Sequence, residues 1–162
     1  MKPALRIDAS SKPPAGPSGR VTAPFEAGSV LLDPRTHGGD SVRLVWKKED
    51  KGLAVPAGRY VASHWSIEKE HQGETWIMSV SGPGGPEIEV KAGEEVALDL
   101  DTKVHVQGQL RHHGKSARLQ LGITGGNGMG LSVIKKDKLV EIGYRIEDAK
   151  GREAGKGVMT YG

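Results

Sequence analysis

From residue 40 onward, apolar and polar residues alternate along short stretches of the chain, and most of these stretches end at a glycine. The alternation is regular in residues 41–46, 87–90, 95–100 and 117–121. Successive side chains of a strand point to opposite faces, so this period is typical of an antiparallel sheet with one buried and one solvated face. No stretch shows a convincing helical period. The pattern therefore predicts an all-β chain, built as a two-sheet, mainly antiparallel β-sandwich.

Turn-forming residues divide the chain into short segments, as is typical of sandwiches and barrels. The glycine-rich segment 122–130 lacks the Lys and Ser or Thr of a phosphate-binding loop and precedes another strand pattern, so it predicts a hairpin turn. The alternation between turns predicts strands near residues 20–24, 29–33, 41–47, 59–67, 75–81, 87–91, 95–101, 103–111, 116–124, 129–135, 139–147 and 157–161.

The proline-rich start of the chain predicts a flexible N-terminal segment over residues 1–19, in which residues 5–8 form a short edge strand or a tail. Residues 20–162 then form a single domain, and the Pro- and Gly-rich stretch 82–86 is where a subdivision would fall. No stretch approaches the roughly 20 apolar residues that span a bilayer, and the N-terminus has no apolar signal core.

Only 36% of the 162 residues are hydrophobic and 4% are aromatic, so the three tryptophans are the largest pieces available for a core. Trp46 alternates with Val42 and Leu44, and Trp65 alternates with Val61 and Ile67, which predicts both indoles in the core. Tyr60 and His64 then fall on the face opposite Trp65. Trp76 follows a predicted loop, where an exposed indole can stack on a sugar ring.

Charge is unevenly distributed, although the net charge is only +3. Residues 1–102 hold 12 basic and 15 acidic residues, a net of −3, and residues 103–162 hold 11 and 5, a net of +6. A basic C-terminal half can attract an anionic partner. No clustered basic stripe with interleaved aromatic residues accompanies it, so we expect a solvated face and no nucleic-acid partner.

The residues that usually carry chemistry are sparse. There is no cysteine and no Gly-x-Ser-x-Gly nucleophile motif. The six histidines show no zinc-ligand spacing, so no cofactor is predicted. The acidic residues on the outward faces of strands 87–91 and 95–101 could bind calcium, but amphipathic alternation alone explains them. The weak metal-ligand candidates are Asp99, Asp101, His112 and His113.

The stretch Val55-Pro56-Ala57-Gly58-Arg59-Tyr60 resembles a strand entry of prealbumin-like and carboxypeptidase-regulatory-like β-sandwich domains. The closing stretches 144–151 and 155–162 resemble the C-terminal end of sandwich domains in uncharacterised exported bacterial proteins. The resemblance implies an immunoglobulin-like or prealbumin-like sandwich. It also implies a non-catalytic appendage used in packing, adhesion or ligand contact, in a periplasmic, cell-surface or secreted protein.

Three hypotheses follow. The first is a non-catalytic structural or interaction module of an exported bacterial protein, with a protein or surface-polysaccharide partner. The second is a carbohydrate-binding module that uses Trp76, with Tyr60 or His64 as further contacts. The third is a small metal-dependent or hydrolytic enzyme that uses His64, His105 or His112. The oligomeric state stays open.

Overall fold

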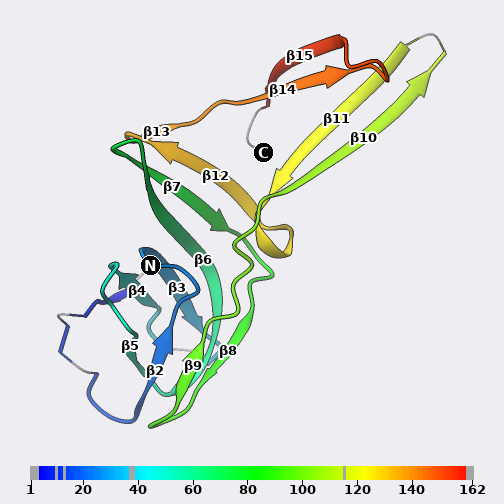
Figure 1. The fold of residues 1–162 in the computed structure, drawn as a ribbon. Coiled ribbons are helices and arrows are strands. Elements are labelled where there is room, and N and C mark those ends of the chain that lie inside the picture. The colour runs from blue at the N-terminus through cyan, green and yellow to red at the C-terminus, as the bar shows by residue number, and fades with distance from the viewer. Residues whose placement is uncertain (1–3, 10, 13, 37–38, 115, 160–162) are drawn as a thin grey trace.

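The computed structural model describes residues 4–9, 11–12, 14–36, 39–114 and 116–159. Within these residues the chain is all-β, with several mostly antiparallel sheets and one short 3₁₀ turn, η1 (Gly126–Gly128). Figure 1 shows a compact region at one end, with two β-hairpins projecting from the other. The predictions of an all-β chain and of a turn within residues 122–130 are confirmed.

The largest sheet has ten strands in the order β1-β4-β3-β6-β7-β12-β11-β10, with β8 added to β6 and β13 added to β12. All of its pairs are antiparallel except β1 with β4. Its strands are β1 (Leu5–Ile7), β3 (Gly28–Pro34), β4 (Val42–Trp46), β6 (Gly58–His71), β7 (Glu74–Ser81), β8 (Glu87–Val90), β10 (His105–His113), β11 (Ser116–Thr124), β12 (Gly130–Lys135) and β13 (Lys138–Leu139).

Two smaller sheets complete the fold. One has three strands in the order β5 (Leu53–Pro56), β2 (Ser18–Thr22) and β9 (Glu95–Ala97), and its β2–β9 pair is parallel. The other is the two-stranded hairpin of β14 (Ile142–Glu147) and β15 (Glu153–Met159).

Each of the twelve predicted strands overlaps an observed one. Residues 160 and 161 of the last prediction lie outside the described residues. β5 was not predicted, because a four-residue strand between Gly52 and Ala57 is too short to show a period.

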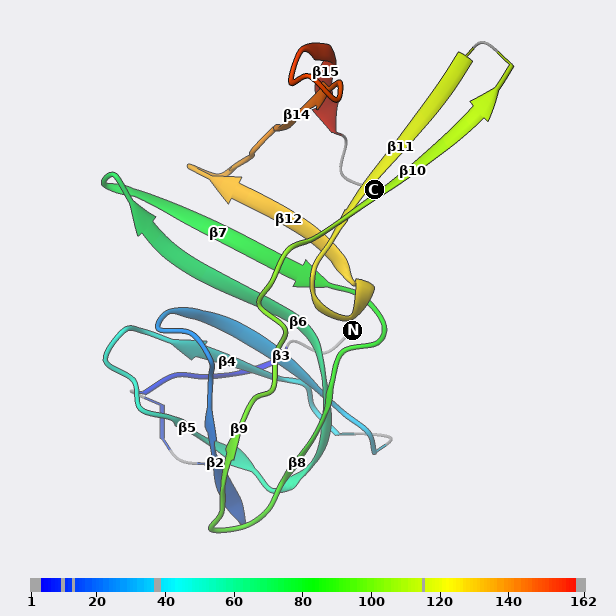
Figure 2. The same ribbon diagram turned by 45° about the vertical axis from the view of Figure 1, so that its right-hand side comes forward.

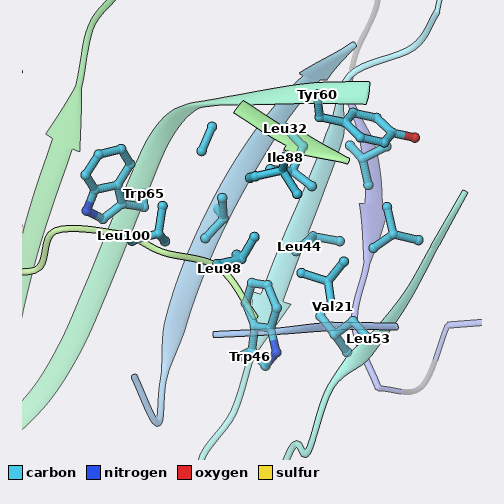
Figure 3. Close-up of a cluster of buried hydrophobic side chains, with 14 of the residues drawn as sticks. Val21, Leu32, Leu44, Trp46, Leu53, Tyr60, Trp65, Ile88, Leu98 and Leu100 are labelled. Atoms are coloured by element: carbon cyan, nitrogen blue, oxygen red, sulfur yellow. The ribbon is translucent and has the colours of Figure 1, made fainter. Parts of the chain in front are cut away.

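One hydrophobic cluster joins the large sheet to the three-stranded sheet (Figure 3). Val21 and Leu53 come from the small sheet, and Leu44 and Trp65 come from the large one. Trp46 and Trp65 are buried, as predicted. Ile7 also lies in this cluster, so the packed region includes β1, an edge strand that precedes Arg20.

A β-bulge in β6 changes which residues face the core. Leu31 pairs with His64 and Leu32 pairs with Ala62, so Ser63 is an extra residue in the strand. An extra residue reverses the inward and outward positions that follow it. Tyr60 therefore lies on the buried side together with Trp65, and the prediction that it lies on the opposite face is wrong.

The two acidic strands do not pair with each other. β8 pairs with β6 of the large sheet, and β9 pairs with β2 of the small sheet, so the chain crosses from one sheet to the other between them. Their alternation is as predicted, because Ile88, Val90 and Leu98 are buried, whereas Glu87 and Glu89 are exposed.

The β10–β11 hairpin, residues 105–124, extends beyond the core and is called the arm (Figure 2). All nine residues of β10 are exposed. The arm joins the rest of the large sheet through one residue pair, Thr124 with Gly130.

Trp65 provides a test of this core. Trp65→Ala removes a fully buried indole, so we expect the free energy of unfolding in urea to fall by about 3–5 kcal/mol. The matched variant Trp76→Ala removes the same group from a half-buried position and should cost clearly less. Equal losses would contradict the placement of the core.

Candidate functional site

A groove of about 750 Å³ opens where the large sheet extends past the core. Its floor is one face of β6, β7 and β12, where Ile67, Met78 and Val133 form a row across neighbouring strands. The segment 24–27 lines the groove as well. The groove exists because these three strands run on beyond the residues that the three-stranded sheet covers.

Trp76 lies in the next row of the floor, between Lys69 on β6 and Lys135 on β12. The Lys135 Nζ lies 4.7 Å from the centroid of the indole ring, a cation–π contact. One face of the Trp76 ring is therefore covered by a side chain of the same protein.

Glu74 holds this cation in place. Its carboxylate forms ion pairs with Lys135 and with Lys136, the latter at 2.6 Å. Hydrogen bonds from the two ammonium groups lower the pKa of Glu74 to about 2. The carboxylate therefore stays ionised throughout the neutral range. The end of the groove is thus a fixed network of charges around the indole.

The indole N–H of Trp76 is buried and has no hydrogen-bond partner among the described residues.

At the other side of the groove, Phe25 packs edge-on against Trp46, with ring centroids 5.9 Å apart and an interplanar angle of 87°. The groove is consequently an apolar floor with a rim of mixed charge, provided by residues such as Glu26 and Lys48.

The structure does not bring the three predicted ligand contacts together. Trp76 lines the groove, whereas Tyr60 is buried in the core and donates its hydroxyl hydrogen to the Pro56 carbonyl at 2.9 Å. His64 lies on the other face of the sheet, as predicted, because it directly precedes Trp65 in β6 and successive strand side chains point to opposite faces. A sugar ring stacked on Trp76 would therefore not contact Tyr60 or His64.

A polar row on that other face was not found from the sequence. Ser29, Ser66, Ser79 and Ser132 pair in register across β3, β6, β7 and β12. The Ser29 and Ser66 hydroxyls lie 2.9 Å apart, and His64 Nε2 lies 3.3 Å from the Ser79 hydroxyl. Single serines on separate strands carry no sequence signal until the strand register is known.

The arrangement of acid, base and hydroxyl around His64 does not form a catalytic triad. Asp33 accepts hydrogen bonds from Ser41 and Ser63, each at 2.5 Å, whereas His64 contacts Ser79. The acid and the base therefore serve different serines, although a triad needs them in one chain of hydrogen bonds.

The weak metal candidates are spread along the chain. Asp99 is exposed, and Asp101 accepts a hydrogen bond from the Lys103 backbone N–H and contacts His105 Nε2 at 2.7 Å. These two contacts lower the pKa of Asp101. His112 and His113 lie at the far end of β10. In the described parts of the chain, no three His, Asp or Glu side chains gather as metal ligands.

The arm carries a second candidate surface. Val106, Leu110, Leu119 and Leu121 lie on one face of the hairpin, and His105, Gln107, Gln109, Arg111 and Arg118 lie on the other. Val106 is 66% exposed and Leu110 is 58% exposed. This apolar face is therefore uncovered for most of its length.

The β14–β15 hairpin is also amphipathic, but its apolar face is only partly open, because Ile142 and Tyr144 are half-buried and Ile146 is 36% exposed. Ile142, Tyr144 and Ile146 share one face, opposite Met159, Gly157 and Gly155. A Cβ at Gly157 would lie 2.6 Å from the Tyr144 hydroxyl, so the ring lies flat over the glycine. The result is a flat apolar face on a sheet that pairs with no other described strand.

No protein-family model, curated protein or solved structure matches this chain. Within the described residues there is also no helix of the length and apolar character that crossing a bilayer requires.

The position of His64 predicts a pH effect. Burial, together with the nearby positive charge of Arg43, lowers the pKa of His64 below its usual 6.5. His64 in the unfolded chain therefore takes up a proton at a higher pH than in the folded chain. The contribution of neutral His64 to the free energy of unfolding is fully present above pH 6.5, and it is lost as the pH falls through the folded pKa.

We expect His64→Gln to lose less stability than the wild type between pH 6.5 and 5, measured by urea unfolding at each pH. His71→Gln, which makes the same substitution at an exposed position on the same strand, is the matched control. Parallel profiles for the wild type and His64→Gln would contradict this prediction.

Proposed function

We propose that this chain is a non-catalytic structural or interaction module of an exported bacterial protein, and that it engages its partner through the projecting hairpins. The observation that carries the proposal is the uncovered apolar face of the arm, with Val106 and Leu110 more than half exposed. Contiguous apolar surface of this kind marks interaction sites in soluble proteins. The exported location rests on the resemblance to exported sandwich domains.

The compact region serves as the scaffold in this proposal. Its large sheet and its three-stranded sheet share one hydrophobic cluster, which supports a β-sandwich of the immunoglobulin-like or prealbumin-like kind. The hairpins are then additions to a sandwich, and binding residues commonly lie on such projecting segments of a rigid scaffold.

The geometry at the base of the arm supports a role for the arm that is separate from the stability of the core. A Cβ at Gly126 would lie 2.4 Å from Asp101 Cβ and 2.6 Å from the Asp101 carbonyl oxygen. The chain thus leaves for the arm and returns from it at adjacent points. An element whose two ends meet can be removed without separating the strands that remain.

Carbohydrate binding at the Trp76 groove is the alternative. A half-buried indole in a groove favours it, because an indole can stack on a sugar ring. Lys135 already covers one face of that ring, so a sugar must displace the ammonium or use the other face. This alternative therefore has less support than the interaction module.

Tryptophan fluorescence separates the two functions. Under the interaction module, soluble polysaccharides leave the emission and acrylamide quenching of the wild type unchanged. A polysaccharide that shields one tryptophan from acrylamide in the wild type, and has no effect on Trp76→Ala, would replace this proposal with the carbohydrate-binding alternative.

Excision of the arm tests the proposal directly. A variant in which a two-glycine link replaces residues 103–124 should keep a thermal unfolding temperature within a few degrees of the wild type. The arm contributes no fully buried residue to the core, and Ile123, which is half-buried, is its one described residue that packs against the hydrophobic cluster. The same variant should lose binding to isolated bacterial envelopes, measured with fluorescently labelled protein.

A matched control keeps the arm and changes its polar face, by Gln109→Asn. The control should bind envelopes as the wild type does. Unchanged envelope binding after excision, or a large drop in the unfolding temperature, would contradict the proposed role of the arm.

A further inference from the structure

We infer that the arm binds the interface of a membrane that contains anionic lipids, with its apolar face toward the acyl chains and its polar face among the headgroups. The inference rests on the proposed function, and it names lipid as the partner. It is carried by two opposite faces of one exposed hairpin, which projects from the compact region in Figure 2. Val106 and Leu110 lie on the apolar face, and Arg111 and Arg118 lie on the polar face.

The apolar face of the arm is open to water. Val106 and Leu110 are each more than half exposed, and Leu119, which pairs with Leu110, is exposed as well. Between Val106 and Leu110, and on the residues that pair with them, this face carries no Lys, Arg, Asp or Glu side chain. The face can therefore leave water without the cost of desolvating an ion.

Positive charge on the arm is not balanced by the arm's own residues. Residues 102–124 contain four Lys or Arg residues and no Asp or Glu. Six of the nine arginines of the chain form an ion pair with a carboxylate. In the part of the chain that the structure describes, neither Arg111 nor Arg118 does so, and Arg111 Nη2 lies 3.5 Å from the side-chain oxygen of Gln109. Exposed cations without counter-charges indicate an anionic partner.

The opposite placement of the two faces favours lipid over other anionic partners. A folded protein that covers the apolar face leaves the arginines of the polar face in water. An acidic polysaccharide that neutralises the arginines leaves Val106 and Leu110 in water. The interface of a bilayer surrounds an amphipathic element, since its acyl chains take up the apolar side chains and its headgroups contact the rest. Because long arginine side chains also bend toward phosphates, a lipid interface satisfies both faces at once.

The edges of the arm limit how deep it can lie. β10 is the last strand of the large sheet, and β11 pairs with β12 at Thr124 alone. Most backbone groups along both edges therefore have no strand partner among the described residues, and such groups do not enter the hydrocarbon region. The backbone stays in the hydrated headgroup layer, and only apolar side chains reach the acyl chains. The arm consequently lies on the membrane and does not span it.

The attachment of the arm allows it to lie along a surface. Residues 98–104, which lead into β10, form no strand, and the single pair of Thr124 with Gly130 joins the returning strand to the sheet. A hairpin attached in this way can turn while the core stays closed.

Vesicle flotation tests the role of charge. We expect the full chain to float with vesicles of equal parts phosphatidylglycerol and phosphatidylcholine, and not with vesicles of phosphatidylcholine alone. Arg111→Gln combined with Arg118→Gln should raise the lipid concentration for half-binding about 25-fold, because each basic residue near an anionic surface contributes about fivefold. Lys47→Gln combined with Lys51→Gln removes the same charge from exposed positions of the compact region. This control should change the half-binding concentration by less than about twofold, because those charges lie far from the bound arm.

A fluorescent probe tests the insertion of the apolar face. The chain contains no cysteine, so Val106→Cys can carry a single environment-sensitive fluorophore. On anionic vesicles its emission should shift to the blue and be quenched by lipids with brominated acyl chains. Gln109→Cys, on the polar face of the same strand, is the matched control and should show little of this quenching.

Leu110→Gln keeps the charge of the arm and removes apolar surface from it. We expect its binding to anionic vesicles to be about tenfold weaker than that of the wild type. The position is exposed in the free chain, so the variant should keep the thermal unfolding temperature of the wild type. An unchanged affinity for the vesicles would contradict insertion.

The inference is overturned if the wild type binds neither kind of vesicle, binds both equally, or binds anionic vesicles while the fluorophore at position 106 stays in water. Binding to dextran sulfate as tight as to anionic vesicles, without a shift in emission, would replace lipid with an acidic polymer. The excision experiment separates these results from the proposed function. An arm that envelope binding requires and that binds no vesicle refutes lipid and retains the interaction module. An arm that neither kind of binding requires refutes both.

Discussion

The need to bury one face of every amphipathic strand determines how this molecule is built. Aromatic residues are scarce, so the core relies on alternating Val, Leu and Ile, with Trp46 and Trp65 as its largest members. The three-stranded sheet is small and covers only part of the large sheet. Where that cover ends, the same alternation continues without a partner, first in the Trp76 groove and then in the two hairpins.

The two exposed regions solve this problem differently. In the groove, Lys135 lies over Trp76 and Glu74 fixes Lys135, so charged side chains of the chain itself cover the indole. Along the arm, the charged residues Arg111 and Arg118 lie on the opposite face and offer no such cover. The groove is thus partly satisfied within the single chain, and the arm is not.

The sequence predicts where the strands lie, but it does not predict which strands pair with each other. The alternation of apolar and polar residues predicted nearly every strand, because a strand with one buried face alternates whichever element packs against that face. It did not reveal the bulge at Ser63, which has no signature in residue type and which moved Tyr60 into the core. The neighbours of Trp76 come from strand pairing, so Lys69 and Lys135 could not be connected to it beforehand. The sequence pattern of an amphipathic strand is also the same whether its apolar face is covered by its own chain or by another molecule.

The single residue pair between Thr124 and Gly130 has a consequence for dynamics. Cooperative opening spreads through shared backbone pairing, and here the pairing between the arm and the remainder of the large sheet is nearly absent. The arm can therefore fray and re-form many times while the core stays closed. The cost of ordering the arm is then part of the free energy of binding to it. Substitutions that raise or lower the strand propensity of residues 105–124 can therefore change the affinity without changing the contact itself.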